Sequence, residues 1–358
     1  MAQNPFIYMR GLKHAAFTVF CVEDGQKKYF DPQFGKSLPY SSGQQVKRSI
    51  IDKICEVLNV ELSPTTFCFE KDKKGMIKQG EPLSSCDPHY IDQLLGGWMK
   101  AVKDGKEKTV KRRSPFCISA MTPLHPLLAG LPSENISFDR SNNPSAHKVK
   151  VRGLDNQELT DEQIAAFLNG DDKGARSFFR SWIPNNNRAT GLFTYDVAID
   201  LRRLFCVSTN RYEPEITSEM VENLKNDGWK VINTAFGESL LMPEEQRKKV
   251  IPAIADALID WHITSNQART FSLMETLAIA ISDNANTLAA AIRAKLIDDN
   301  EDKPKAKPIV DENAGASTYV TLPCANYIVT ESESADALEQ AKQGLINRMT
   351  SFDYENQL

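Results

Sequence analysis

The chain has 358 residues, of which 41% are hydrophobic and 25% are charged, and its formal net charge is −4. This composition is typical of a globular protein with a sizeable core, and the acidic balance excludes a polybasic protein that binds nucleic acid over its whole surface. Any nucleic-acid-binding surface must therefore be a local stripe of cations.

The strongest signatures of enzymes and metal sites are missing from the sequence. The seven cysteines form no C-x-x-C pair, the five histidines are dispersed, and neither a Walker-type loop nor a G-x-S-x-G motif occurs. The first residues lack the apolar run of a signal peptide, and no stretch of about 18 apolar residues could span a membrane. We expect a cytoplasmic binding protein with reduced thiols, no metal, no cofactor and no membrane contact.

The first predicted element is a core strand from Ala15 to Val22, rich in β-branched and aromatic residues. Arg10, Lys13 and His14 precede it, and a loop that contains Lys36 follows it. This loop leads into a predicted helix.

The helix is predicted to begin at Gly43. Ser41 and Ser42 each precede a glutamine by three residues, so either can form a capping box. Val46, Ile50, Ile54, Val57 and Leu58 recur at helical spacing as a buried stripe, while Gln44, Lys47 and Arg48 share the first turns of another face. Free amides, hydroxyls and the helix dipole favour a phosphate at this end, although an ordinary capped helix with a solvated basic face is the more common origin of such a pattern.

From Leu62 to Gly153 prolines and turn residues are frequent and apolar periodicity is weak, which indicates an insertion. The basic run from Lys103 to Arg113 is typical of a solvated loop, but it would also suit a phosphate backbone. Further on, after Arg140, cations and valines alternate from Lys148 through Lys150 to Arg152. This alternation predicts a strand with a basic face for a polynucleotide, or an exposed edge strand protected by charge.

Aromatic and arginine residues are interleaved before an asparagine-rich turn at 185–187. Phe178, Phe179, Arg180 and Trp182 would suit a projecting hairpin that stacks on bases and grips phosphates. The plain alternative is that these rings belong to the core.

The remainder alternates predicted strands and helices. Phe193 to Leu201 has the clearest strand alternation, and a polar loop ending in Arg269 and Thr270 precedes a strand from Phe271 to Ile281. We predict helices at Ser218–Asp227, Glu244–His262, Asn286–Leu296 and Ser334–Met349, a charged linker at Asp298–Pro308, and a strand at Thr318–Val329.

The order of these pieces resembles the Cas-seven family of CRISPR-associated RAMP proteins, the repeated backbone subunit of type I effector complexes (Cascade). The matching features are the Ser-Ser-Gly-Gln-Gln-Val-Lys-Arg helix at 41–48, the strand from Gly191 to Leu201, and the Gln-Ala-Arg-Thr loop at 267–270. The resemblance extends to about Asp283.

The resemblance implies an α+β fold, a modified RRM or ferredoxin-like palm with an inserted finger domain and a thumb β-hairpin. The expected division is the first part of the palm at 1–61, the finger region at 62–153, the thumb region at 154–191, the second part of the palm at 192–297, a linker at 298–317, and a C-terminal strand and helix at 318–358.

The resemblance also implies partners: a CRISPR RNA, a target DNA or RNA strand, further copies of the chain, and other effector-complex subunits. Ser42, Gln44, Lys47 and Arg48 would hold the guide backbone, and the thumb would displace a base at regular intervals. The full set of expected RNA-binding residues is Arg10, Lys13, Lys36, Ser42, Gln44, Lys47, Arg48, Arg140, Lys148, Lys150, Phe178, Phe179, Arg180, Trp182, Arg269 and Thr270.

Two other function classes stay open. The turn at Glu23-Asp24-Gly25 resembles a loop of type III relatives in which an aspartate cleaves target RNA, so Asp24 is the candidate catalytic residue of an endoribonuclease; less favoured is a transcript-processing enzyme with His14 as its base. A lone aspartate is ordinarily a turn residue, and we expect no enzyme. The third class is a non-CRISPR, RRM-like binder of single-stranded RNA.

Overall fold

The computed structural model describes residues 4–20, 25–80, 82–100, 109–134, 150, 152, 156–169, 186–263, 271–298 and 304–357. The chain divides into two compact units, Met1–Pro132 with Arg188–Leu358 and, separately, Ser133–Asn187. In the described part, no helix has the length and apolar character needed to cross a membrane.

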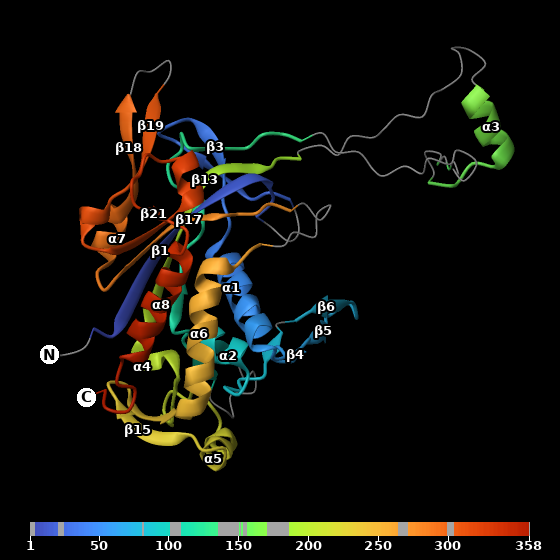
Figure 1. The fold of residues 1–358 in the computed structure, drawn as a ribbon. Coiled ribbons are helices and arrows are strands. Elements are labelled where there is room, and N and C mark those ends of the chain that lie inside the picture. The colour runs from blue at the N-terminus through green and yellow to red at the C-terminus, as the bar shows by residue number, and fades with distance from the viewer. Residues whose placement is uncertain are drawn as a thin grey trace. The chain divides into compact units, whose positions relative to one another are not determined.

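A central sheet organises the larger unit. β1 (Phe6–Thr18) lies in its middle, paired antiparallel with β13 (Ala189–Asp200) on one side and with β17 (Thr276–Ser282) on the other (Figure 1). The outer strands are β10 (Phe116–Ile118), β11 (Thr122–Pro123) and β12 (Ala129–Gly130) beside β13, and β20 (Ser317–Thr321) and β21 (Glu333–Ser334) beyond β17. The last two are parallel, so the sheet is mixed. The predicted α+β class is confirmed.

Three helices cover one face of this sheet: α1 (Gly43–Leu58), α6 (Glu244–Asp260) and α8 (Ala337–Thr350) (Figure 1). Alternate residues of the central strands, such as Met9 and Val197, join their buried side chains in one hydrophobic cluster. The predicted stripe on α1 is confirmed at Val46, Ile50 and Ile54, which are fully buried, whereas Val57 is 44% exposed.

The opposite face of the sheet is also covered. Leu12, Ala278 and Ala280 pack in a second cluster with Leu288 of α7 (Ala285–Ala291) and Cys324 of the 3-10 helix η3 (Leu322–Asn326). The segment after α7 then forms a separate two-stranded ribbon, β18 (Ile292–Asp298) with β19 (Lys305–Val310). The central sheet is therefore a buried middle layer over much of its area.

Shorter elements surround this core. Before β10 they are β2 (Lys28–Asp31), β3 (Lys36–Pro39), β4 (Thr65–Thr66), β5 (Phe69–Lys71), β6 (Ile77–Gln79), β7 (Leu83–Ser84), α2 (Ile91–Gly96), β8 (Trp98–Lys100) and β9 (Val110–Arg112). After β13 they are α4 (Leu201–Leu204), β14 (Cys206–Ser208), α5 (Ser218–Asn226), β15 (Lys230–Thr234), β16 (Gly237–Leu241) and η2 (Glu312–Ala314). The smaller unit contains α3 (Asp161–Asn169).

Several predicted elements differ from the structure. The helix predicted at Asn286–Leu296 is wrong in its second half, because β18 begins at Ile292 and pairs with β19. Accordingly, Lys305–Val310 form a strand inside the range expected to be a linker. The last strand ends at Thr321 instead of Val329, since Pro323 has no amide for the ladder and a 3-10 helix follows. β10, β11 and β12, within the expected insertion, belong to the central sheet.

Candidate nucleic-acid interface

The start of α1 has a capped first turn. The Ser42 hydroxyl accepts a hydrogen bond from the Gln45 amide at 3.4 Å, which confirms a cap at this serine, while Ser41 is held in a β-bridge with Met121. The Gln45 side chain donates to the Ser49 hydroxyl instead of completing a capping box. The amides of Gly43 and Gln44 have no partner among the described residues, and the first turn contains no acidic residue. This helix end therefore offers free donors and a positive dipole.

Close packing fixes the position of that end. A Cβ atom at Gly43 would lie 2.7 Å from the carbonyl oxygen of Ile118, at the end of β10. Only a residue without a side chain lets the helix approach the strand this closely. The first turn of α1 is thus held at the edge of the central sheet.

The polar side chains in the first two turns of α1 differ in how exposed they are and in the partners they already have. Gln44 is exposed, and Arg48, with 54% of its side chain exposed, forms a 2.8 Å ion pair with Asp52 one turn later. The Lys47 ammonium instead donates to the carbonyl oxygen of Gly96, the last residue of α2, at 3.0 Å. Burial lowers the pKa of Lys47, and the nearby Arg112 charge acts in the same direction. Gln44 and Arg48 are therefore the accessible pair.

Arg10 and Lys13 lie on opposite faces of the sheet. Arg10 makes a bidentate pair with Asp196 at 2.6 and 2.9 Å and donates to the Ile292 carbonyl on the face covered by α7. Lys13 lies beneath the end of α6, where its ammonium donates to the carbonyls of Ile259 and Met274 and to the Thr276 hydroxyl. Burial lowers the pKa of Lys13 to about 8, against the opposing attraction of Asp260 and Glu275.

Two further expected residues lie elsewhere in the described part of the chain. Lys36 is exposed in the β2–β3 hairpin, and in the smaller unit Lys150 pairs with Glu158 at 2.8 Å. Asp24, Arg140, Lys148, Phe178, Phe179, Arg180, Trp182, Arg269 and Thr270 lie outside the described residues, and their roles stay predictions.

His14, the candidate base of the transcript-processing alternative, already has hydrogen-bond partners. Its Nδ1 lies 2.9 Å from the Glu275 carboxylate and 3.0 Å from the Tyr327 hydroxyl, and its ring stacks on that of Tyr327 at 4.4 Å. Its side chain is 16% exposed. In the part of the chain that the structure describes, no three His, Cys, Asp or Glu side chains are grouped to hold a metal ion.

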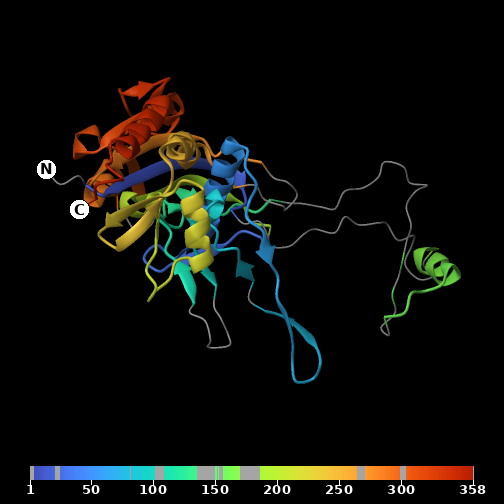
Figure 2. The same cartoon turned by 90° about the horizontal axis from the view of Figure 1, so that it is seen from below.

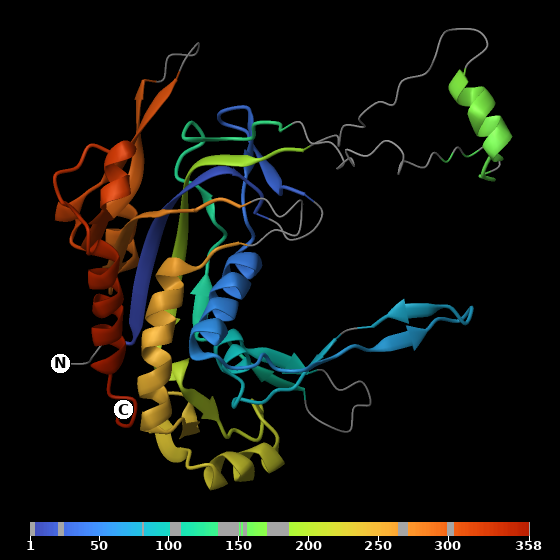
Figure 3. The same cartoon turned by 45° about the vertical axis from the view of Figure 1, so that its right-hand side comes forward.

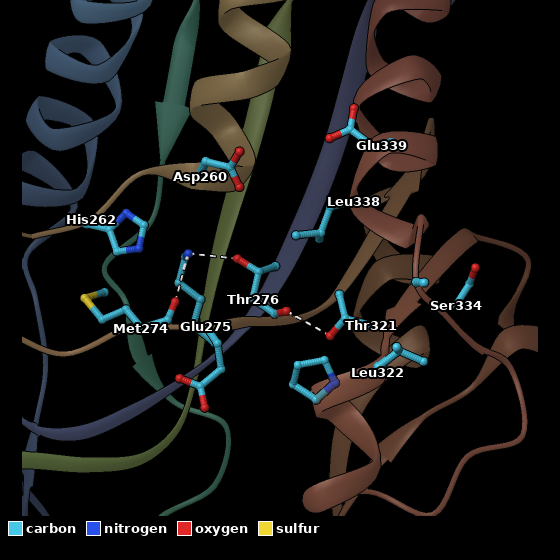
Figure 4. Close-up of a pocket in the computed structure, with 13 residues that line it drawn as sticks. Asp260, His262, Met274, Glu275, Thr276, Thr321, Leu322, Ser334, Leu338 and Glu339 are labelled. Atoms are coloured by element: carbon cyan, nitrogen blue, oxygen red, sulfur yellow. Dashed lines mark hydrogen bonds between the residues drawn. The ribbon is translucent and has the colours of Figure 1, made fainter.

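A pocket of about 460 Å³ opens where α6 ends, between β17, η3 and the start of α8 (Figure 4). Lys13 reaches into it, but its ammonium is bonded to protein oxygens, and the carboxylates of Asp260, Glu275 and Glu339 line the same space. The Lys13 ammonium is buried and satisfied, and Asp260 and Glu275 add negative charge beside it, so the pocket offers phosphate little attraction. This pocket is therefore a poor site for a nucleic-acid backbone.

The β5–β6 hairpin is a candidate that the sequence reasoning missed. It extends away from the body of the larger unit (Figure 2, Figure 3), and Phe67, Phe69, Met76 and Ile77 on or beside it are each at least 63% exposed. Its cations are Lys71, Lys73, Lys74 and Lys78. The alternation from Phe67 to Lys71, followed by the Asp72-Lys-Lys-Gly75 turn, was the available signal. Aromatics and lysines together are typical of single-strand binding.

Comparison with known proteins gives distant structural similarities. No protein-family model and no curated protein matches the chain. A chain of a "CRISPR RNA-guided surveillance complex, pre-nicking" is 9% identical, with a TM-score of 0.43, and the match covers 96% of this chain and 88% of that one. A chain of a second "CRISPR RNA-guided surveillance complex" is 10% identical, with a TM-score of 0.36, and covers 98% and 86%. Both TM-scores lie below 0.5, so this chain departs substantially from both.

Proposed function

We propose that this chain is a guide-RNA-binding backbone subunit of a CRISPR effector complex, built on an RRM-like palm. The observation that carries the proposal is topological. Along the chain, the elements β1, α1, β10, β13, α6 and β17 follow one another in the order β-α-β-β-α-β, and in the sheet the four strands lie in the order β10-β13-β1-β17. This is the element order of ferredoxin-like domains, and it supports the palm that the sequence resemblance implies.

The covered sheet argues against an ordinary RRM-like reader. RRM domains stack bases on the open face of their four-stranded sheet. Here the β1 and β17 part of that face is packed against α7 and η3, and Arg10 on it is engaged by Asp196 and Ile292. RNA must therefore be bound at an edge of the palm or on projecting elements.

The first turn of α1 is the proposed contact for guide phosphates. The free amides of Gly43 and Gln44, the Gln44 side chain and the Arg48 guanidinium lie on one short stretch of the chain. An exposed ion pair such as Arg48 with Asp52 is worth only about 0–1 kcal/mol, so the guanidinium can exchange its carboxylate for a phosphate at little cost. Affinity then comes from the backbone, and sequence recognition is left to base pairing.

The β5–β6 hairpin is the proposed source of stacking contacts. An isolated two-stranded hairpin is marginally stable in water, and this one exposes Phe67 and Phe69 to solvent. Bases stacked on these rings would cover apolar area that the chain itself leaves uncovered.

The test is an RNA titration with the full chain carrying Gln44→Ala and Arg48→Ala. We expect weaker binding to a repeat-spacer transcript and a salt dependence smaller by about 0.7 units of slope, because Arg48 is the one cation that the variant removes. Lys248→Ala, an exposed lysine that is ion-paired on α6, is the control. Unchanged affinity and slope in the folded double variant would remove α1 from the interface.

We propose no catalytic step for this chain. The endoribonuclease alternative depends on Asp24, and it makes a sharp claim about products. An assembled complex incubated with complementary RNA and a divalent metal should leave that RNA intact. Regularly spaced fragments that disappear in Asp24→Ala would establish the endoribonuclease instead.

A further inference from the structure

The β18–β19 ribbon carries an unusual pair of like charges. In its antiparallel register Lys295 lies directly opposite Lys307, and both side chains are exposed. Directly opposed residues have Cβ atoms about 4.5–5.5 Å apart, and two cations at this spacing destabilise a strand pair. The arrangement therefore costs the ribbon stability.

Further cations extend the same face. Side chains alternate along a strand, so Arg293 shares the face of Lys295, and Lys305 shares that of Lys307 about 6.8 Å away. Arg293 pairs with Asp311 at 3.0 Å, whereas Lys295, Lys305 and Lys307 have no ion pair or hydrogen bond with any described residue. In the register Lys305 lies opposite Asp298, so the ribbon presents one pair of uncompensated ammonium groups, Lys295 and Lys307, on a protein of net charge −4.

We propose that this ribbon binds the phosphate backbone of a nucleic acid at a second contact, separate from the first turn of α1. α1 packs on one face of the central sheet, while β18 follows directly after α7, which covers the other face, and Figure 1 shows the ribbon beyond the far end of α7. A phosphate bound between Lys295 and Lys307 would be attracted by both ammonium groups and would offset the repulsion between them. A two-stranded ribbon also has the shape that the major groove of a duplex admits.

The charge along the ribbon limits the contact to its strands. In the sequence, four carboxylates and Lys303 fall between residues 298 and 303, and Asp298 lies opposite Lys305, whereas Lys295 and Lys307 lie farther along the strands from this acidic segment. A backbone bound to the strands should therefore run across the ribbon near its base.

The bland explanation is protection of exposed strands by charge, because lysines on edge strands prevent pairing with other chains. The two explanations predict different behaviour of the variant Lys295→Gln with Lys307→Gln. If the lysines bind phosphate, their removal weakens nucleic-acid binding and leaves the melting temperature equal or higher, since a repulsion has been relieved. If they only protect, their removal causes aggregation and leaves binding per folded molecule unchanged.

The experiment titrates the full chain with a short double-stranded DNA and, separately, with poly-U RNA over a range of salt concentrations. We expect the double variant to lower the salt slope by nearly two units on the duplex, or by about 1.4 units on the single strand, and the two arms identify which backbone is bound. The control is Lys225→Gln with Lys248→Gln, two exposed lysines that already have carboxylate partners.

Unchanged slopes on both probes would overturn the proposal, as would aggregation with normal binding. Loss of self-association with normal nucleic-acid binding would also overturn it, because the partner would then be a second copy. The inference stands apart from the guide-binding role of α1. Failure of that role would appear in Gln44→Ala with Arg48→Ala, and failure of this one in the lysine variant.

Discussion

Gly11 and Tyr195 face each other across β1 and β13, and the tyrosine ring occupies the space of the side chain that Gly11 lacks. A Cβ at position 11 would lie within 2.6 Å of the Tyr195 hydroxyl oxygen. That hydroxyl donates at 2.7 Å to the Leu258 carbonyl in the last turn of α6. One glycine therefore allows a fully buried tyrosine to tie the sheet to the helix above it.

Gly11→Ala should destabilise the protein by about 1–3 kcal/mol, because the buried ring must move to admit a methyl group. Urea unfolding monitored by circular dichroism measures the change. Gly130→Ala is the control, since nothing lies within 4 Å of the corresponding Cβ position. Equal midpoints for the two variants would contradict the packing described here.

The buried Lys13 predicts a pH-dependent stability. Its pKa is about 8 in the folded chain and ordinarily 10.5, so between these values the unfolded state binds more protons and stability rises with pH. The measurement is the free energy of unfolding of wild type minus that of Lys13→Met at each pH. The titrating groups that the two proteins share cancel in this difference. This difference in the free energy of unfolding should rise in favour of wild type by up to about 3 kcal/mol between pH 7 and pH 10. A difference that does not change with pH would show that the ammonium is not desolvated.

Phe67→Ala with Phe69→Ala should separate RNA binding from folding. Both rings are 65% exposed, so the melting temperature should change by a few degrees at most. Where a base stacks on a ring, RNA affinity should fall by about 1–3 kcal/mol. Phe30→Ala, a ring 64% exposed on β2, is the matched control. A large loss of stability in the double variant, with normal RNA binding by the remaining folded protein, would place these rings in the fold instead of the interface.

Lys342 of α8 forms ion pairs with two aspartates of α6, and we predict that these pairs stabilise the packing of the two helices. Its ammonium lies 2.8 Å from both Asp256 and Asp260. Although burial lowers its pKa, the bonds to these carboxylates outweigh that effect and raise it. Lys342→Met leaves two neighbouring carboxylates unpaired and should lower stability at pH 7, with partial recovery near pH 4 as they protonate. Hydrogen exchange should rise first in α8, and unchanged protection there would contradict this role.

The structural features that could be predicted from the sequence are those determined by residues that are close together in the chain. The cap of α1 depends on Ser42 and an amide three residues later, and β13 follows from strict alternation along one segment. Lys13 could not be assigned in this way, because its acceptors come from the end of α6 and from residues 274 and 276. A cation in a strand normally indicates an exposed face, and only the fold supplies the carbonyls that bury it.

Long-range pairing also explains the errors at the C-terminal end. Local periodicity favours a helix through Leu296, and the charges and prolines that follow favour a linker. The pairing of Ile292–Asp298 with Lys305–Val310 overrides both preferences. Alternation and a turn signal indicate the β5–β6 hairpin, but the exposure of Phe67 and Phe69 on it follows only from the fold.

The central proposal is that copies of this chain assemble along one guide RNA, and the number of copies bound to each transcript tests it most directly. The protein purified together with a repeat-spacer transcript can be weighed by native mass spectrometry and imaged by electron microscopy. The account predicts several copies for each transcript in a regular helical array, with a copy number that rises when the spacer is lengthened. The account would be contradicted if each transcript carried a single copy at every spacer length. It would also be contradicted if the protein did not retain the repeat-spacer RNA during purification.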